Sequence, residues 1–246
     1  MKKVLILLIA CFLILEVNAQ NKKDKAYPFI GIIQTPPNTA YNFNSFDIID
    51  NYGYRAHIPL GDQKLSQQNW GFNLGASVPM IEHLNFLADM QFSFGKAFNF
   101  LFLLGPAFNI VESNIFTFGP TVKAGFAYTY IGLGEVTTNG SYVLMGNGKI
   151  FDGDKMHANL YGVCYQLGVF GSCRLNKKIS LFSQFGLGGA YLGLMDIRIT
   201  PYEGEPFNID VSRNDCVEPN SQTPISFTPK VKSYGYYYNL GVAFGF

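Results

Sequence analysis

The sequence is poor in charge, and its main part has no long apolar run. Charged residues are 14% of the chain, against about 25% in ordinary soluble proteins, whereas aromatic residues reach 16%. So few charges make a soluble surface difficult to build. After residue 20 no window holds about 18 uninterrupted apolar residues, which excludes a bundle of membrane-spanning helices. A net charge of +1 gives no electrostatic basis for binding nucleic acid.

Cysteine is also scarce, and its spacing fits no metal site. Beyond the N-terminal region the chain has Cys164, Cys173 and Cys216, an odd number that leaves at least one thiol unpaired in an exported protein. Cys164 and Cys173 fall in one expected strand on opposite faces, so they do not bridge each other. We expect two small wall residues and one loop thiol, and the pairing of Cys216 stays open. No metal or cofactor is expected.

The N-terminus has the features of a secretory signal peptide. Lys2 and Lys3 form a basic region, and the apolar run at 4–15 is about twelve residues long, short of the ~20 that span a membrane. Val17 and Ala19 are the small residues at the −3 and −1 positions of a cleavage site, so 1–19 is predicted to be removed. A lipobox ending at Cys11 is the rival, but the apolar residues continue past it.

The abundant feature is alternation of large apolar residues with small or polar ones. This period of two is the primary signal of half-buried strands. Seven segments carry it: 70–78, 86–94, 98–110, 116–130, 161–173, 179–199 and 234–246.

The two faces of these strands differ in charge. The outward positions hold no charged residue, whereas the inward face holds Asp89, Lys123, Arg174, Asp196 and Arg198. A Lys or Arg that faces lipid at mid-bilayer costs about 2–4 kcal/mol, but one that faces the lumen costs little. The pattern therefore predicts an all-β fold, an antiparallel transmembrane β-barrel of the outer-membrane type.

The connections predict the orientation of this barrel. The links at 80–85, 111–114 and 175–178 are short, and they alternate with 95–97 and the long loops 135–156 and 201–230. Outer-membrane barrels have short periplasmic turns and longer extracellular loops. Both termini are then expected on the periplasmic side.

Single-chain bacterial barrels have even strand numbers, so one more strand is needed before Trp70. Phe46–Ile58 is preferred because Tyr52 and Tyr54 alternate there with polar residues, although Asp50 falls on the lipid side. The alternative, Tyr27–Gln34, is apolar on both faces. Either choice gives eight strands. With the first, residues 20–45 form an N-terminal periplasmic or mouth segment and 46–246 form the barrel.

Several polar residues fall on inward positions at middle depth. An eight-stranded barrel has an interior just wide enough for side chains to fill it. We therefore expect a polar plug, with a narrow conduit or ligand pocket as the alternative. The expected plug residues are Asn73, Asp89, Gln91, Lys123, Gln166 and Gln184, with Asp89 and Lys123 as partners.

Two prolines interrupt the outward face. Pro106 and Pro120 lie at nearly the same height on neighbouring strands, and each removes a ladder hydrogen bond. They predict a local bulge or dent in the wall. That dent is a possible lateral contact for a neighbouring barrel, with simple bending of the wall as the alternative.

The C-terminal strand carries a family resemblance. Tyr238, Leu240, Val242, Phe244 and Phe246 resemble the terminal signal that outer-membrane proteins present to the barrel assembly machinery. The mature chain, about 227 residues, resembles the small eight-stranded OmpA/OmpX/OmpW-like barrels in the Tyr- and Gly-rich style of Bacteroidota. The resemblance implies location and fold, but such barrels serve many functions.

For function, we expect a non-enzymatic structural or accessory subunit of the outer membrane. Loops 135–156 and 201–230 are the expected surface for other envelope proteins. One alternative is a narrow channel for small solutes or apolar ligands. The other is a rim-located lipid-modifying enzyme built on His57 or His157, with Ser66, Asp152 and Asp154 in nearby loops; no spacing specifies a triad.

Overall fold

The structure is a computed structural model, and every regular element among the residues that it describes is a β-strand. Among the residues that it describes, no helix is long and apolar enough to cross a membrane. The described residues are 26–35, 38–41, 46–50, 52–58, 63–65, 69–95, 97–140, 142–145, 148–202, 205–209, 216–217 and 230–245. The predicted signal peptide and the lipobox rival at Cys11 lie outside them.

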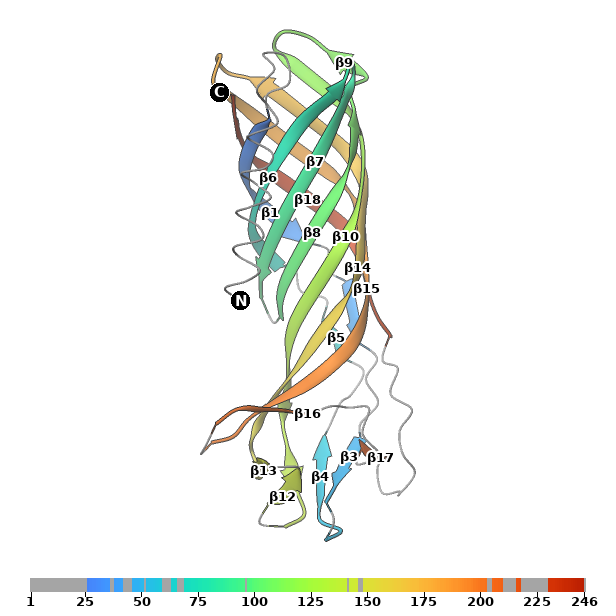
Figure 1. Cartoon of the computed structure of the whole chain (residues 1–246), viewed down its shortest axis with the longest axis vertical. Helices are drawn as coiled ribbons and strands as arrows, with labels where there is room; N and C mark the ends of the chain where they lie inside the picture. The colour runs from blue at the N-terminus through green and yellow to red at the C-terminus, as the bar shows by residue number, and fades with distance from the viewer. Residues whose placement is uncertain are drawn as a thin grey trace.

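Eight antiparallel strands close into a ring (Figure 1). In ring order they are β1 (Tyr27–Thr35), β6 (Asn69–Ile81), β7 (Leu84–Phe94), β8 (Ala97–Phe108), β10 (Phe116–Glu135), β14 (Lys155–Arg174), β15 (Ile179–Thr200) and β18 (Lys230–Phe244). The ring closes where β1 pairs with β18, with Ile32 opposite Leu240. The prediction of eight antiparallel strands is confirmed, and all seven segments identified by alternation are ring strands.

The preferred first strand was wrong. β1 at Tyr27–Thr35 is the eighth ring strand, paired with β6 and β18, so the segment assigned to residues 20–45 contains part of the ring. It is apolar on both faces because its inward residues, Phe29 and Ile33, are packed into the interior. Phe46–Ile58 instead forms a hairpin outside the ring, from β3 (Phe46–Ile49) and β4 (Arg55–Ile58).

Asp50 explains why that hairpin turns back on itself. Its carboxylate accepts hydrogen bonds from the backbone amides of Tyr52 and Tyr54, at 2.8 and 2.9 Å, in the turn between the two strands. Side-chain capping of this kind favours a turn over a continuous strand. The charge that conflicted with a lipid-facing strand is therefore the residue that ends it.

The outward face of the ring is apolar and exposed. Side chains at alternate positions project outward from all eight strands. Examples are Ile30, Ile32, Phe72, Phe86, Leu104, Val122, Phe126, Val163, Leu167, Phe185, Leu187 and Leu240. No Asp, Glu, Lys or Arg is interleaved with them along the outward rows from Trp70 to Met80 and from Tyr161 to Cys173.

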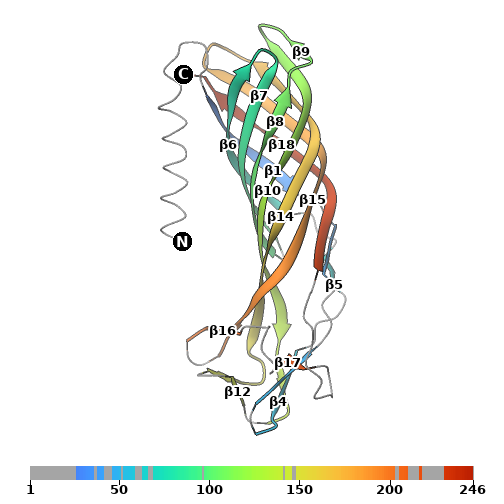
Figure 2. The same cartoon turned by 45° about the vertical axis from the view of Figure 1, so that its right-hand side comes forward.

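Three strands are longer than the others and leave the ring together. β10, β14 and β15 continue past the ends of β7 and β8 and carry smaller elements beyond the ring (Figures 1 and 2). These elements are β3, β4, β11 (Thr137–Thr138), β12 (Val143–Met145), β13 (Gly148–Ile150), β16 (Phe207–Ile209) and β17 (Cys216–Val217). We call the far ends of the three strands, with these elements, the extension.

At the other end of the ring the connections are short. They run from Ile81 to Leu84, from Phe108 to Phe116 with β9 (Val111–Glu112) inside, and from Arg174 to Ile179. We call this the turn end; the C-terminal strand β18 also finishes there (Figure 1). Near the opposite end β2 (Asn38–Tyr41) pairs with β18, and β5 (Gln63–Leu65) pairs with β2.

Register shifts occur where the long strands enter the extension. The ladder between β14 and β15 shifts at Asn159–Leu160, and one residue of β15 has no partner there. An extra residue reverses the alternation beyond it. Ile197 and Ile199 are therefore buried, whereas Arg198 is exposed. The prediction that Asp196 and Arg198 face inward was wrong for this reason.

Candidate functional site

The ring interior has a polar layer at middle depth. The layer contains the six side chains expected there, Asn73, Asp89, Gln91, Lys123, Gln166 and Gln184, and all are buried. Their strands bring them to one level because Asn73 lies opposite Gln91 across β6 and β7, and Lys123 lies opposite Gln166 across β10 and β14. Alternation sends each of these side chains inward.

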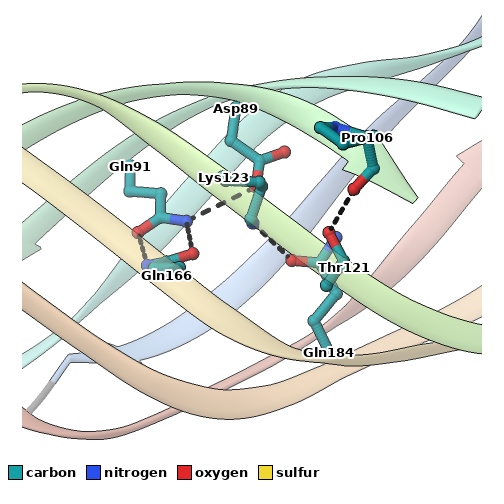
Figure 3. Close-up of polar contacts among 7 residues, drawn as sticks. All are labelled: Asp89, Gln91, Pro106, Thr121, Lys123, Gln166 and Gln184. Carbon is teal, nitrogen blue, oxygen red and sulfur yellow. Dashed lines mark hydrogen bonds and ion pairs between the residues drawn. The ribbon is translucent and has the colours of Figure 1, made fainter. Parts of the chain in front are cut away.

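Hydrogen bonds join five members of the layer (Figure 3). The Lys123 ammonium forms an ion pair with Asp89 and donates a 2.8 Å hydrogen bond to Oε1 of Gln184. Gln91 and Gln166 form a reciprocal amide pair, with N–O distances of 2.8 and 3.2 Å. Because both charges are fully buried, each depends on the other to offset its desolvation.

Asn73 lies beside this network without joining it. Among the described residues, neither polar atom of its side chain has a hydrogen-bond partner, and the same is true of Asn239. The two amides flank Gly31, where an added Cβ would come within 2.7 Å of both amide oxygens. Glycine at this position lets the two side chains approach each other.

Cavities lie on both sides of the polar layer. At the turn end, a cavity of about 470 Å³ is lined by Phe29, Leu87, Phe182 and Arg174 and reaches Gln184. A smaller one, about 40 Å³, has Gln166 in its lining and lies toward the extension. The layer therefore closes the interior between the two cavities.

A buried apolar cluster runs from the ring into the extension. One buried cluster contains Leu103, Ala127, Ile131, Leu160 and Leu192 from the ring strands. It also contains Phe46, Ile48, Val136, Val143, Ile150, Ile197, Ile199 and Ile209 from the extension. The extension is thus a packed structure that shares a core with the ring, and the described parts of the loops expected at 135–156 and 201–230 belong to it.

Tyrosines project from the extension. Tyr202 is 94% exposed and Tyr52 is 76% exposed; Tyr54 and Tyr142 are also exposed. Hydrogen bonds hold the turn that carries Tyr52 and Tyr54. The Asp50 carboxylate, which binds the amides of both tyrosines, also accepts a 3.4 Å hydrogen bond from the Leu144 amide. Tyrosine combines a large apolar ring with a hydroxyl, a combination that suits protein contacts.

The rim residues considered for catalysis have separate hydrogen-bond partners. His57 Nδ1 is 2.7 Å from Asp47, which also pairs with Arg55 at 3.1 Å. Asp152 and Asp154 accept backbone hydrogen bonds from Thr138, Phe151 and Tyr202, so they hold loops in place. Ser66 lies outside the described residues.

His157 stacks on Tyr130, with ring centroids 4.7 Å apart. Burial lowers the pKa of His157, and the positive charges of Arg198 and Lys155 lower it further. Within the described residues, no group of three His, Cys, Asp or Glu side chains is placed to hold a metal ion.

The two prolines interrupt one ladder without a bulge. The ladder between β8 and β10 passes from Ala107–Thr121 to Leu104–Ala124 with no change of register. The intervening pairs are missing beside Pro106, and the Thr121 hydroxyl donates a 3.3 Å hydrogen bond to its carbonyl. No residue is inserted, so the expected bulge is absent, while a lateral contact at Pro106 and Pro120 stays a prediction.

The terminal strand and the cysteines are the last of the residues singled out from the sequence. Tyr238, Leu240 and Phe244 are exposed on the outward face of β18 with Val242 between them, and Phe246 lies outside the described residues. Cys164 and Cys173 are free thiols, the first of them buried. The side chain of Cys216 also lies outside the described part.

Comparison with known proteins assigns no family to this chain. No protein-family model matches the sequence, and no curated protein matches it. Among solved structures, the crystal structure of a Pseudomonas aeruginosa FadL homologue is similar over 92% of this chain and 91% of that chain, with a TM-score of 0.30 and 7% identity. A likeness at this TM-score carries no argument about fold or function.

Proposed function

We propose that this chain is an integral β-barrel of the bacterial outer membrane. The support is the closed ring with an exposed apolar exterior and a buried polar layer inside. In a bilayer every backbone polar group must be paired internally, a condition that a closed ring meets. The outward apolar row of β14 from Tyr161 to Cys173 is long enough for a spanning strand, which needs about 9–11 residues.

On this proposal the turn end is periplasmic and the extension is extracellular. A cleavable signal peptide at 1–19 would export the chain, and the C-terminal strand from Tyr238 to Phe246 would be read by the barrel assembly machinery. Tyr128, Tyr161 and Tyr191 would mark the outer membrane–water boundary, where aromatic residues gather.

We further propose that the protein is a non-enzymatic accessory subunit that presents the extension to another envelope protein. The observation that carries this proposal is the core shared by the ring and the extension, which holds the exposed tyrosines on a rigid support. A preorganised surface loses little conformational entropy on binding. An extension with no partner would not need such packing.

The test is extraction from native outer membranes in mild detergent, followed by native mass determination and identification of bound proteins. We expect a complex of fixed composition that is lost in Tyr52→Ser/Tyr54→Ser. Ile110→Ser is the matched control, because it removes an equally exposed apolar side chain at the turn end. A species at the mass of the mature chain alone would contradict the accessory-subunit proposal.

A narrow channel is the second candidate, favoured by the two cavities on either side of the polar layer. Conduction would require the Asp89–Lys123 and Gln91–Gln166 pairs to separate. Single-channel recording in planar bilayers tests this candidate. Discrete openings that become more frequent in Gln166→Ala would support it, and silent membranes with both proteins would rule it out.

A further inference from the structure

The cavity at the turn end has the size of a ligand site. Its volume of about 470 Å³ falls within the roughly 300–1,000 Å³ typical of small-molecule pockets. Residues of all three short connections contribute to its lining, among them His83, Asn114 and Arg174. It is therefore open toward the turn end and ends at Gln184 of the polar layer.

The inner part of the cavity is apolar. Phe29, Leu87, Phe170 and Phe182 line it, and each is buried against its neighbours. The rings of Phe29 and Phe182 lie 4.7 Å apart and form one side of the wall. A surface of this kind favours a hydrocarbon chain, since each CH₂ group that leaves water for an apolar wall strengthens binding.

The mouth of the cavity holds a cation without a counter-ion. Within the described part of the chain, the Arg174 guanidinium makes no hydrogen bond and no ion pair. Ser180 lies opposite Arg174 in the ladder between β14 and β15, and Ser172 precedes it on the same face. The guanidinium and the two hydroxyl groups together offer donors to an anionic group.

Two carboxylates, of Glu82 and Glu112, also line the mouth, and in the described part of the chain neither forms an ion pair with Arg174. Glu112 lies 3.1 Å from Nδ1 of His83, and Glu82 lies 3.7 Å from Nε2 of the same ring. His83 has a φ of 64°, a left-handed conformation that non-glycine residues rarely adopt. Its carbonyl accepts a 2.8 Å hydrogen bond from the Asn109 amide, which helps to hold it. These carboxylates are therefore tied to His83.

We propose that this cavity binds a single-chain amphiphile with one anionic head group. The hydrocarbon chain would lie among the four apolar side chains, and the head group would bind Arg174 beside Ser172 and Ser180. A carboxylate and a phosphate monoester share this chemistry, because either accepts a bidentate hydrogen bond from a guanidinium. The site is separate from the tyrosines of the extension and does not depend on the accessory-subunit proposal.

The test is calorimetric titration of the full mature protein in amphipol with three probes of equal chain length. Dodecanoate and dodecyl phosphate are anionic, and dodecyltrimethylammonium is the cationic control. We expect the better anion to bind at least tenfold more tightly than the cation. Preference for dodecanoate would indicate a free fatty-acid-type ligand, and preference for dodecyl phosphate a phospholipid-type head group; each supports the site.

Two variants locate the binding. Arg174→Gln should weaken binding of the better anion about tenfold or more, because the charged hydrogen bonds to its head group are lost, and should not weaken binding of the cation. Lys149→Gln, a cation in the extension, is the matched control and should change nothing. Ala243→Phe should block the cavity, which Ala243 helps to line. Equal affinity for all three probes, no binding, or an Arg174→Gln protein that binds like wild type would overturn the proposal.

Discussion

The interior of the ring is filled in two different ways. At middle depth the polar layer around Lys123 and Asp89 occupies the space, whereas toward the extension Leu103, Ile131 and Leu192 belong to an apolar core. Removal of either charge from the polar layer would leave the other charge buried without a partner, which has a high cost in free energy. The apolar core instead continues into the extension. The difference teaches that one ring can close its interior with polar pairs and also anchor a second structure.

Breaking the Asp89–Lys123 ion pair should cause the largest loss in the free energy of unfolding. Lys123→Ala leaves the Asp89 carboxylate buried without its cation, which should lower the free energy of unfolding by about 3–5 kcal/mol. Urea unfolding in lipid vesicles, followed by the fluorescence of Trp70, measures it, because Trp70 is the only tryptophan of the chain. The double variant Lys123→Met/Asp89→Leu should recover most of the loss. A loss below 1 kcal/mol in Lys123→Ala would mean that the pair behaves like a solvated one.

The outward face of the ring should respond to charge, and the extension should not. Leu167→Arg places a cation on the outward row at middle depth, so it should cost about 2–4 kcal/mol in a bilayer. Tyr202→Arg, on the fully exposed tip of the extension, is the control and should cost almost nothing. The same urea titration in vesicles compares them. Equal stabilities of the two variants would argue against a lipid-facing ring.

A milder change tests whether the ring and the extension share one core. Ile197→Val should lower stability by about 0.5–1.5 kcal/mol, since it removes a methyl group at a fully buried position. If the core is continuous, the Trp70 transition and tryptic cleavage at Lys155 should shift together. Faster cleavage with an unchanged Trp70 transition would show that the extension unfolds by itself.

The smallest expected effect is a pH dependence confined to the extension. Burial first, and then Arg198 and Lys155, lower the pKa of His157, so the folded state binds its proton less readily than the unfolded state. The stability that the neutral imidazole of His157 contributes is therefore present above about pH 6.5, the ordinary histidine pKa, and is lost as the pH falls further. The protection factors of β14 amides near His157, which correct for the intrinsic pH dependence of hydrogen exchange, should fall below that pH. His157→Gln should flatten the dependence, and an unchanged profile would exclude this histidine as its source.

Much of the candidate site could be predicted because it depends on local alternation. Lys123 and Gln166 lie inward by the parity of strands that the sequence displays clearly, and the structure brings them together with Asp89 and Gln184. The cavity at the turn end could not be predicted in this way. Its wall combines Phe29 of β1 with Phe182 of β15, which are neighbours only after the ring has closed.

The errors have two physical origins. Parity along a strand is lost when a residue is inserted, which is why Asp196 and Arg198 were assigned to the wrong face. Likewise, a strand with two apolar faces such as β1 looks unlike its neighbours because its inward side packs against a core that the sequence does not display. Asp50 was the available signal, since its placement on the outward face conflicted with the preferred first strand.

The sequence by itself determined the all-β character, the seven alternating strands and the polar inward residues, because backbone geometry sends successive side chains to opposite faces. The tertiary structure decided which segment closes the ring, how the extension forms and where the cavity lies. These features depend on contacts between residues far apart in the chain, such as Thr137 of β11 with His57 of β4. Such contacts are selected by packing and by shared burial, and no local pattern encodes them.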